Sequence, residues 1–482
     1  MALNLLLADP DEEWCLSMAK FFSEHLYKVD CASNGRDVQK LLYSKKYFSL
    51  ILNFEIQNHS AMQVLKYVAT HHKKIRAIVI LEREHIKEDE ELEEKLEKMG
   101  VDEIIIKPFS KDDLKRILEG HQSIGELMNS LPKRKGQSKE VEVEASESEY
   151  TSVSIADFYS LDSVLFDVYV KLGSGKFIKV LHMGDEFNRE RLDHYKDKGV
   201  ECLYFHKSDR MRYVKFNNHL ASKLVNNTKV KTRSKLKLLR NVMDKFIEDS
   251  YDEGVKPVVL EQGKQICENI YTFIQNSNDL HKHFQMMLEF DPDAFEHSYL
   301  VTLFSSAMIK QFEWESKTMI QNTALACMFH DIGKMKVDRE ILDKSRSDLT
   351  DEELEIYQQH PVFGVDQLAG VKDINFSTKQ IILQHHEAYD GTGYPHGLKG
   401  AKILTLANIV ACADSLIHTC KEHKCTPVNA LKFLLKDEKK VSKFNSQVTE
   451  KLIHVFVDPV KLAGLKKTKA EDPRLNTLKR TG

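Results

Sequence analysis

The chain has 482 residues, of which 42% are hydrophobic and 30% are charged, and its formal net charge at pH 7 is −3. This length predicts about three domains, and the near-neutral charge gives no overall attraction to nucleic acid or to an anionic membrane. No apolar run approaches the length that a bilayer requires, and the opening residues are too short for a signal peptide. The eight cysteines form no CxxC pair, which is typical of reduced thiols. We therefore expect a cytoplasmic protein with no membrane contact.

Residues 1–120 alternate short apolar runs with helical spacing, which predicts an α/β domain built on a doubly wound parallel sheet. The apolar runs are Leu5–Ala8, Leu50–Leu52, Ile78–Leu81 and Glu103–Ile106. Polar residues end these runs, at the edge where such a sheet builds its site. These residues are Asp9, Asn53, Glu82 and Lys107.

This pattern resembles the receiver domain of response regulators. The resemblance implies an acidic pair, a phosphoacceptor Asp, a Ser or Thr, and a Lys at the strand ends. Here Pro10 follows Asp9. Asn53 stands at the phosphoacceptor position, Glu82 replaces the hydroxyl residue, and Lys107 alone is unchanged. Because an amide cannot form an acyl phosphate, we expect a pseudo-receiver that docks a protein partner or dimerises. A passive spacer is the alternative.

Three further segments follow before the C-terminal part. Residues 121–150 are predicted to be a linker, because residues 132–150 are polar and carry opposite charges. Residues 151–217 predict a small α/β module with a β-hairpin and a helix over Arg189–Lys198. Residues 218–284 have helical spacing, which predicts a stalk that supports a homodimer. Their basic run over residues 228–240 has no interleaved aromatic residues, so we expect no nucleic acid partner.

The helical spacing of residues 285–460 predicts an all-α bundle, and residues 461–482 are predicted to form a basic tail. Two motifs stand out in the bundle. One is Phe329-His330-Asp331-Ile332-Gly333-Lys334, and the other is His385-His386-Glu387-Ala388-Tyr389-Asp390-Gly391-Thr392-Gly393-Tyr394-Pro395. Adjacent imidazoles followed by a carboxylate and a Gly-rich turn are not typical of a packed core. The side chains of His385 and His386 diverge, so they can serve two neighbouring metal ions.

Both motifs together resemble the HD-GYP phosphodiesterases, a branch of the HD metal-dependent phosphohydrolases. Residues 151–217 in turn resemble the β-rich module found ahead of some HD-GYP domains. The resemblance implies a multidomain fold that ends in an HD bundle, with seven metal ligands. These are His297, His330, Asp331, His360, His385, His386 and Asp414. It also places Asp293 where part of the family has a Glu for a third metal ion. Imidazoles and carboxylates without thiolates favour iron or manganese, so we expect two or three such divalent ions.

The expected chemistry is metal-assisted hydrolysis of a phosphodiester. Two metal ions activate a water and neutralise the charge that develops on phosphorus. Asp331 is the expected bridge, because a carboxylate offers one oxygen to each ion. Lys334 is expected to hold a phosphate oxygen, which makes these two the predicted catalytic residues. In the turn, we expect Gly391, Gly393 and Tyr394 to contact the substrate, although a packing role for Tyr394 is equally open.

The resemblance implies cyclic di-GMP as the substrate, with the linear dinucleotide and then GMP as products. The family's Arg-Pro-Tyr-Arg-like stretch, which contacts substrate phosphate after the metal Asp, is missing from residues 415–424. We expect Lys421, His423 or Lys424, each of which is basic or can be, to take its place in substrate binding. The alternative function is a catalytically weak module that binds metal and cyclic dinucleotide. Such a module would signal through protein contacts made by the pseudo-receiver and the Gly-Tyr-Pro turn.

Overall fold

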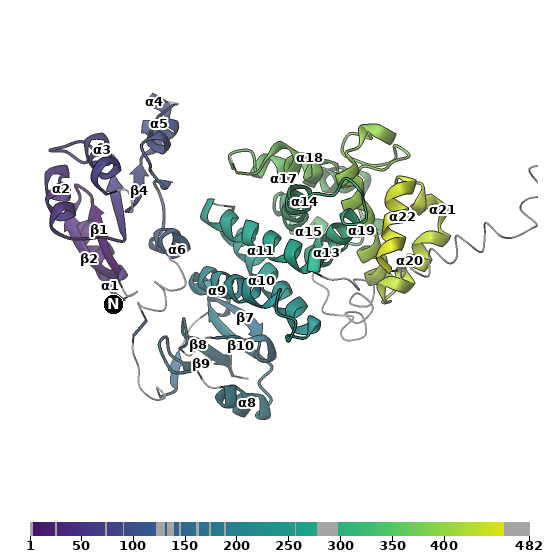
Figure 1. Ribbon diagram of the computed structural model, residues 1–482, viewed down its shortest axis with the longest axis horizontal. Coiled ribbons are helices and arrows are strands. Elements are labelled where there is room, and N and C mark those ends of the chain that lie inside the picture. Colours follow the sequence, from purple (N-terminus) through teal and green to yellow (C-terminus); the bar gives the residue numbers. More distant parts are fainter. Residues whose placement is uncertain are drawn as a thin grey trace, which may run out of the picture. The chain divides into compact units, whose positions relative to one another are not determined.

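The computed structural model describes residues 3–24, 27–72, 75–89, 91–121, 131–132, 139–143, 146–160, 163–172, 175–187, 189–255, 257–276, 297–371 and 373–456. The chain divides into two units, residues 1–216 and residues 217–482. In Figure 1 the colours of the first unit run from purple to teal, and those of the second run from teal to yellow. The first unit contains two β-sheets, and the second is helical where it is described.

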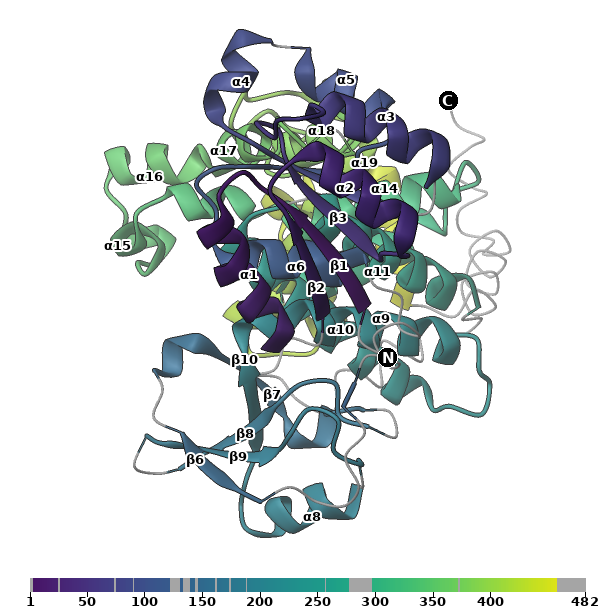
Figure 2. The same ribbon diagram turned by 90° about the vertical axis from the view of Figure 1, so that its left-hand side faces the viewer.

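The N-terminal part of the first unit is a parallel sheet of five strands in the order β2-β1-β3-β4-β5. Its strands are β1 (Leu3–Ala8), β2 (Tyr27–Ala32), β3 (Ser49–Asn53), β4 (Arg76–Leu81) and β5 (Glu103–Ile106). Its helices are α1 (Glu12–Glu24), α2 (Gly35–Ser44), α3 (Ala61–His71), α4 (Arg83–Glu88), α5 (Leu92–Lys98) and α6 (Lys111–His121). Figure 2 shows β2, β1 and β3 side by side. This arrangement confirms the predicted doubly wound α/β domain.

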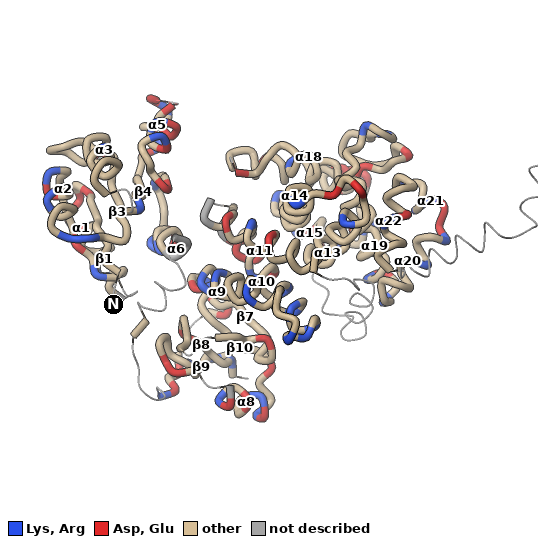
Figure 3. The backbone as a smooth tube through the Cα atoms, in the orientation of Figure 1, with Lys and Arg blue, Asp and Glu red and all other residues tan. Residues whose placement is uncertain are grey.

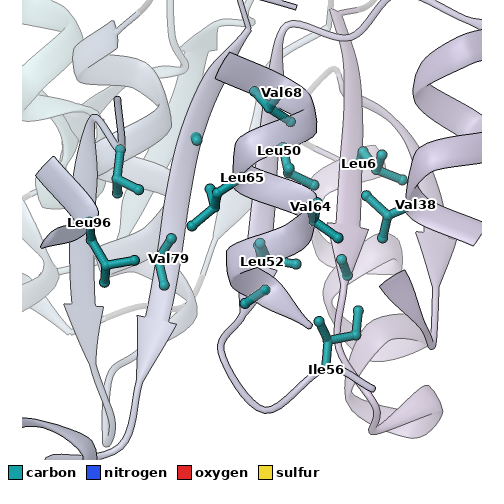
Figure 4. Close-up of a cluster of buried hydrophobic side chains, with 14 of the residues drawn as sticks. Leu6, Val38, Leu50, Leu52, Ile56, Val64, Leu65, Val68, Val79 and Leu96 are labelled. Carbon is teal, nitrogen blue, oxygen red and sulfur yellow. The ribbon is translucent and has the colours of Figure 1, made fainter. Parts of the chain in front are cut away.

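Both faces of this sheet are buried. Successive residues of a strand point to opposite faces, so Leu6, Leu50 and Val79 pack with side chains of α2, α3 and α5 (Figure 4). On the opposite face, Leu7 and Ile78 pack with side chains of α1 and α6. Double burial explains why β1, β3 and β4 appear in the sequence as nearly continuous apolar runs.

Strand β2 has no counterpart among the predicted apolar runs. It has the sequence Tyr-Lys-Val-Asp-Cys-Ala and pairs only with β1, at the edge of the sheet. Only its first and last residues, Tyr27 and Ala32, are buried. An edge strand is covered on fewer sides, so its polar residues interrupt the apolar pattern on which the prediction depended.

The polar residues at the strand ends bond to one another. The amide nitrogen Nδ2 of Asn53 donates to Oδ2 of Asp9 across 2.7 Å, and both residues are buried. The ammonium of Lys107 lies 2.9 Å from Oε1 of Glu82. Each of the four residues named from the sequence therefore has an internal partner at this edge of the sheet.

The rest of the first unit is an antiparallel sheet in the order β6-β9-β8-β10-β7. Its strands are β6 (Val141–Val143), β7 (Tyr150–Ser154), β8 (Val168–Lys171), β9 (Phe177–Leu181) and β10 (Cys202–His206), with α8 (Arg189–Asp197) before β10. Strands β8 and β9 form the predicted hairpin. The polar tract that we predicted as a linker contains a strand, because β6 pairs with β9 through Glu142 and Ile178. The residues Val-Glu-Val of β6 form a short strand at the edge of the sheet, within a charged stretch of the sequence.

The described part of the second unit is an all-α bundle, as predicted (Figure 1). Its longer helices are α10 (Thr232–Glu253), α11 (Pro257–Asn276), α13 (His297–Ile309), α14 (Lys317–Phe329), α16 (Asp351–Gln358), α17 (His360–Gln367), α18 (Phe376–Gln384), α19 (Thr405–Glu422), α20 (Pro427–Lys436) and α22 (Ser446–Phe456). Helix α9 (Arg210–Leu224) spans the boundary between the units. Short elements include η4 (Ile332–Lys336), α15 (Arg339–Leu342), η5 (Arg346–Asp348) and α21 (Glu438–Val441).

Helices α10 and α11, which we predicted as a stalk, pack against the bundle instead. The ring of Phe246 on α10 lies 5.8 Å from the ring of Phe329 at the end of α14. The hydroxyl of Tyr299 on α13 donates to the carbonyl of Leu236 across 2.8 Å. Helical spacing shows that one face of a helix is buried, but it does not show which element covers that face. In α10 most Lys and Arg residues lie in the first half of the helix, and the Asp and Glu residues lie in the second half (Figure 3).

In the described part of the chain, no helix combines the length and the apolar character that crossing a membrane requires. Two sequence predictions lie outside the described residues. One is Asp293, the residue assigned to a third metal ion. The other is the basic tail over residues 461–482.

Candidate metal centre

Four side chains form the first candidate metal group: Asp331, His360, His385 and His386. Each offers one ligand atom, and these atoms all lie within 4.8 Å of one another. His360 begins α17, the two adjacent histidines directly follow α18, and Asp331 lies between α14 and η4. The four side chains of this group therefore come from three helix boundaries.

A second group consists of His297, His330 and Asp414. His297 is the first described residue of α13, His330 directly follows α14, and Asp414 lies within α19. The Nε2 atom of His297 lies 2.8 Å from Oδ1 of Asp414 and 3.3 Å from Nε2 of His330. Helix α13 packs against both α14 and α19, and this packing brings the three side chains together.

Asp331 joins the two groups. Its Oδ1 atom lies 3.5 Å from Nε2 of His360 and 4.0 Å from Nε2 of His385, both in the first group. Its Oδ2 atom lies 3.5 Å from Nε2 of His330, in the second group. One carboxylate oxygen therefore faces each group, which is the arrangement that a bridging ligand needs.

Three of the imidazoles are oriented by backbone carbonyls. The Nδ1 atom of His330 bonds to the carbonyl of Cys327 at 2.7 Å, and Nδ1 of His360 bonds to the carbonyl of Tyr357 at 2.8 Å. His385 repeats the pattern with the carbonyl three residues before it, at 2.6 Å. A carbonyl only accepts, so each Nδ1 carries the proton. Each Nε2 lone pair is then free for a metal ion, as in metal sites with such supporting bonds.

Burial sets the protonation of this site. It lowers the pKa of His360 to about 4 and holds the pKa values of His385 and His386 well below their ordinary value. Burial alone would raise the pKa of Asp331, but electrostatic interactions with His330 and Lys334 outweigh it and hold that pKa well below its usual range. Neutral imidazoles beside an ionised carboxylate form the donor set that a divalent cation requires.

Two buried ring nitrogens support the fit to metal ions. Among the described residues, Nε2 of His386 and Nδ1 of His297 have no hydrogen-bond partner. A buried polar atom without a partner costs free energy, so such atoms call for a ligand or a structural reason. The described geometry brings all seven predicted ligands into two adjacent groups, with His330 and His385 rings 5.1 Å apart.

The Gly-rich turn is held by Glu387, a buried residue. Its carboxylate accepts hydrogen bonds from the backbone N–H of His396 at 2.8 Å and of Leu398 at 2.7 Å. Gly391 has a positive φ of 88°, and a Cβ on Gly393 would lie 2.2 Å from a backbone nitrogen of the preceding segment. Both glycines, which we predicted to contact the substrate, are therefore required by the path of the turn itself.

The remaining predicted site residues lie at different places. The ring of Tyr394 lies beside that of His386 at a tilt, with 4.7 Å between the ring centroids, and its hydroxyl has no hydrogen-bond partner among the described residues. Lys334 lies 2.6 Å from Oδ2 of Asp331. His423 is not part of either group: it follows the end of α19, and its ring stacks on Phe433 at 4.6 Å.

Three residues near the site had no role in the sequence prediction. His418 lies one helical turn after Asp414, with Nε2 3.5 Å from its Oδ1, so an i,i+4 pattern could have identified it. Tyr357 lies beside His360, and Arg346 lies beside Tyr357. No local pattern in the sequence indicates the position of Arg346, because it comes from a separate short element.

Comparison with known proteins finds similarity over the part of the chain that contains this site. Residues 282–448 match the family model described as HD domain. A cyclic di-GMP phosphodiesterase from Pseudomonas aeruginosa is 36% identical over 124 residues, which cover 26% of this chain and 30% of the relative. A cyclic di-GMP phosphodiesterase from Thermotoga maritima is 31% identical over 179 residues, which cover 37% of this chain and 48% of the relative. The matched part therefore spans less than half of either relative.

A solved structure is also similar. It is described as an HDG"Y"P protein from Bdellovibrio bacteriovorus, with 21% sequence identity and a TM-score of 0.48. The similarity covers 64% of this chain and 99% of the solved chain.

Proposed function

Residues 282–448 match the HD domain model, and from this premise we propose that the protein is a metal-dependent phosphodiesterase that hydrolyses cyclic di-GMP. The observation that carries the proposal is the position of Asp331. Its two oxygens face the two groups of histidine and aspartate ligands, at distances of 3.5 Å from His360 and 3.5 Å from His330. A carboxylate in this position is suited to bridge two metal ions, the arrangement used for displacement at phosphorus.

The HD domain implies a divalent metal, and we propose two ions for this chain, either iron or manganese. Asp331, His360, His385 and His386 would hold one ion, and His297, His330 and Asp414 would hold the other, with Asp331 shared. When bound, such ions supply an activated water and positive charge at the phosphorus. Imidazole and carboxylate donors without thiolates favour iron or manganese, although zinc also accepts them.

The chain's own residues position the substrate. Lys334 lies next to the ligand Asp331. We assign its positively charged ammonium to bind a non-bridging phosphate oxygen of the substrate. The free hydroxyl of Tyr394 adds a hydrogen-bond donor beside His386. In the reaction, water adds to phosphorus and the ester bond to the 3′ oxygen breaks, which opens the ring to the linear dinucleotide. A second hydrolysis of the same kind yields GMP.

Three further inferences from the sequence stay predictions: the cytoplasmic location, a homodimer, and protein partners of the pseudo-receiver or the Gly-Tyr-Pro turn. The six-part division into domains also stays a prediction. The alternative function is a module that binds cyclic dinucleotide and metal but turns over little substrate. It is favoured by the position of His423, which packs on Phe433 and does not replace the missing arginine stretch.

The test combines metal analysis with a turnover assay. Protein purified without chelator is expected to contain about two equivalents of iron or manganese and to convert cyclic di-GMP to the linear dinucleotide. Cyclic di-AMP, which has the same phosphodiester ring and different bases, serves as the control substrate. Full metal content with binding but no hydrolysis of cyclic di-GMP favours the binding module. A metal content reproducibly below one equivalent contradicts the dinuclear site.

A further inference from the structure

Arg346 lies in η5, the short element between α15 and α16. Its Nη2 atom donates to the hydroxyl of Tyr357 across 3.2 Å, and its guanidinium carbon lies 5.1 Å from the centroid of the same ring. The side chain is otherwise exposed. One aromatic residue therefore fixes the direction of this arginine by a hydrogen bond and by a cation–π contact.

Tyr357 places Arg346 next to the metal groups. The ring of Tyr357 lies 5.3 Å from the ring of His360, and its carbonyl orients that histidine. The ammonium of Lys334 lies 5.7 Å from the centroid of Tyr357, so two cations converge on one ring.

The charge of Arg346 is not neutralised by a carboxylate. In the part of the chain that the structure describes, no Asp or Glu oxygen lies within 4.0 Å of its guanidinium nitrogens, and its one polar partner is the neutral hydroxyl of Tyr357. Arg339 in the same segment differs, since its Nε atom lies 3.9 Å from Asp343. A guanidinium has five N–H donors in a planar fork, so most of those on Arg346 remain available to an anion.

We propose that Arg346 binds a phosphate of the dinucleotide substrate and takes over the contact that is lost with the missing arginine stretch after Asp414. The proposal rests on the proposed function, since it assigns a substrate-binding residue to that reaction. The fork of a guanidinium matches two phosphate oxygens, whereas a lysine offers a point charge. Lys334 and Arg346, which both lie near the ring of Tyr357, would then hold the phosphodiester together.

The main test is the variant Arg346→Ala, assayed with cyclic di-GMP. Loss of a charged hydrogen bond to substrate is expected to raise KM about 10- to 100-fold, while kcat changes less and metal content stays at the wild-type value. Arg346→Lys restores KM in part, because the charge remains and the fork is lost. Arg339→Ala is the matched control, an exposed arginine of the same segment, and it is expected to behave as wild type.

Tyr357→Phe adds a second measurement. It removes the hydroxyl that holds Nη2 and keeps the ring, so KM is expected to rise less than in Arg346→Ala. The double variant that combines Arg346→Ala with Tyr357→Phe is expected to have the KM of Arg346→Ala, because the hydroxyl then has no arginine to orient. If Arg346 had a purely structural role, the variants of Arg346 and Tyr357 would instead change in metal content or thermal stability.

The outcomes separate this proposal from the proposed function. If wild type hydrolyses cyclic di-GMP and Arg346→Ala has the KM of Arg339→Ala, the proposal is wrong and the function stands. If wild type does not hydrolyse cyclic di-GMP, the proposed function fails, and bis(4-nitrophenyl) phosphate decides the role of Arg346. A raised KM for that diester in Arg346→Ala supports the proposal, and an unchanged KM contradicts it. A chain that hydrolyses neither compound contradicts both.

Discussion

The ammonium of Lys334 lies 2.6 Å from Oδ2 of Asp331, so the residue assigned to the substrate phosphate already contacts the residue assigned as the metal bridge. Both lie in one turn, three residues apart. An ammonium has no lone pair and cannot bind a metal ion, whereas a carboxylate can. Mutation should therefore separate the two roles.

Asp331→Ala is expected to lose metal and activity together. The change removes the one carboxylate that faces both ligand groups, with oxygens 3.5 Å from His360 and 3.5 Å from His330. Elemental analysis and the turnover assay are performed on the same preparation. A variant that keeps two equivalents of metal contradicts the bridging role.

Lys334→Ala is expected to keep its metal and to turn over cyclic di-GMP about 10²- to 10³-fold more slowly, a typical effect of losing one charge-stabilising group. Lys336→Ala, at an exposed lysine two residues further on, is the control and should match wild type. If Lys334→Ala is as fast as this control, its assigned role is wrong and Arg346 carries the phosphate contact alone.

Gly333 and Gly364 form a matched pair for testing how the site is packed. A Cβ on Gly333 would lie 1.9 Å from the carbonyl oxygen of His360, so Gly333→Ala must push η4 away from α17. Overpacking of this kind costs about 1–3 kcal/mol of the free energy of unfolding. We expect Gly333→Ala to lower both thermal stability and metal content, because His360 moves with its carbonyl.

Gly364→Ala is the control for that experiment. Its Cβ would meet no atom closer than 3.4 Å, which is ordinary contact, and alanine is favoured over glycine within a helix. Stability and metal content should therefore remain near the wild-type values. Equal losses in both variants contradict the explanation by packing.

Glu387 is expected to stabilise the Gly-rich turn through its two backbone hydrogen bonds, from His396 at 2.8 Å and from Leu398 at 2.7 Å. Glu387→Ala loses both acceptors, whereas Glu387→Gln keeps one oxygen. A hydrogen bond to a charged group contributes about 1.5–3 kcal/mol to stability. Thermal unfolding in the presence of chelator should therefore rank wild type above Gln and Gln above Ala. The reverse order of the two variants contradicts this role.

The N-terminal sheet is expected to remain unphosphorylated in acetyl phosphate and to bind no beryllofluoride. Asn53 is an amide whose Nδ2 atom is committed to Asp9 at 2.7 Å, and Lys107 is paired with Glu82 at 2.9 Å. Intact-mass spectrometry checks the outcome, with a phosphorylatable receiver domain as a control for the reagent. A phosphate found on an aspartate of residues 1–120 contradicts the pseudo-receiver.

Local sequence determined the ligand types and their supporting geometry. The histidines at positions 330, 360 and 385 each lie at a helix boundary, where the carbonyl three residues earlier is within reach of Nδ1. Helix geometry alone produces this contact, because the carbonyl and the histidine lie in the same short stretch of chain. The four apolar runs likewise predicted four of the five parallel strands. In β1, β3 and β4, burial on both faces leaves a continuous apolar signal.

Only the tertiary structure decided which residues meet. His297 and Asp414 lie far apart in the chain, and the packing of α13 against α19 brings them within 2.8 Å. His423 lies beyond the end of α19 on Phe433, away from both groups, while Arg346 reaches the site from η5 through Tyr357. Spacing along the chain records which side chains share one helix face. Contacts between elements depend on how whole helices pack, and no local pattern contains that information.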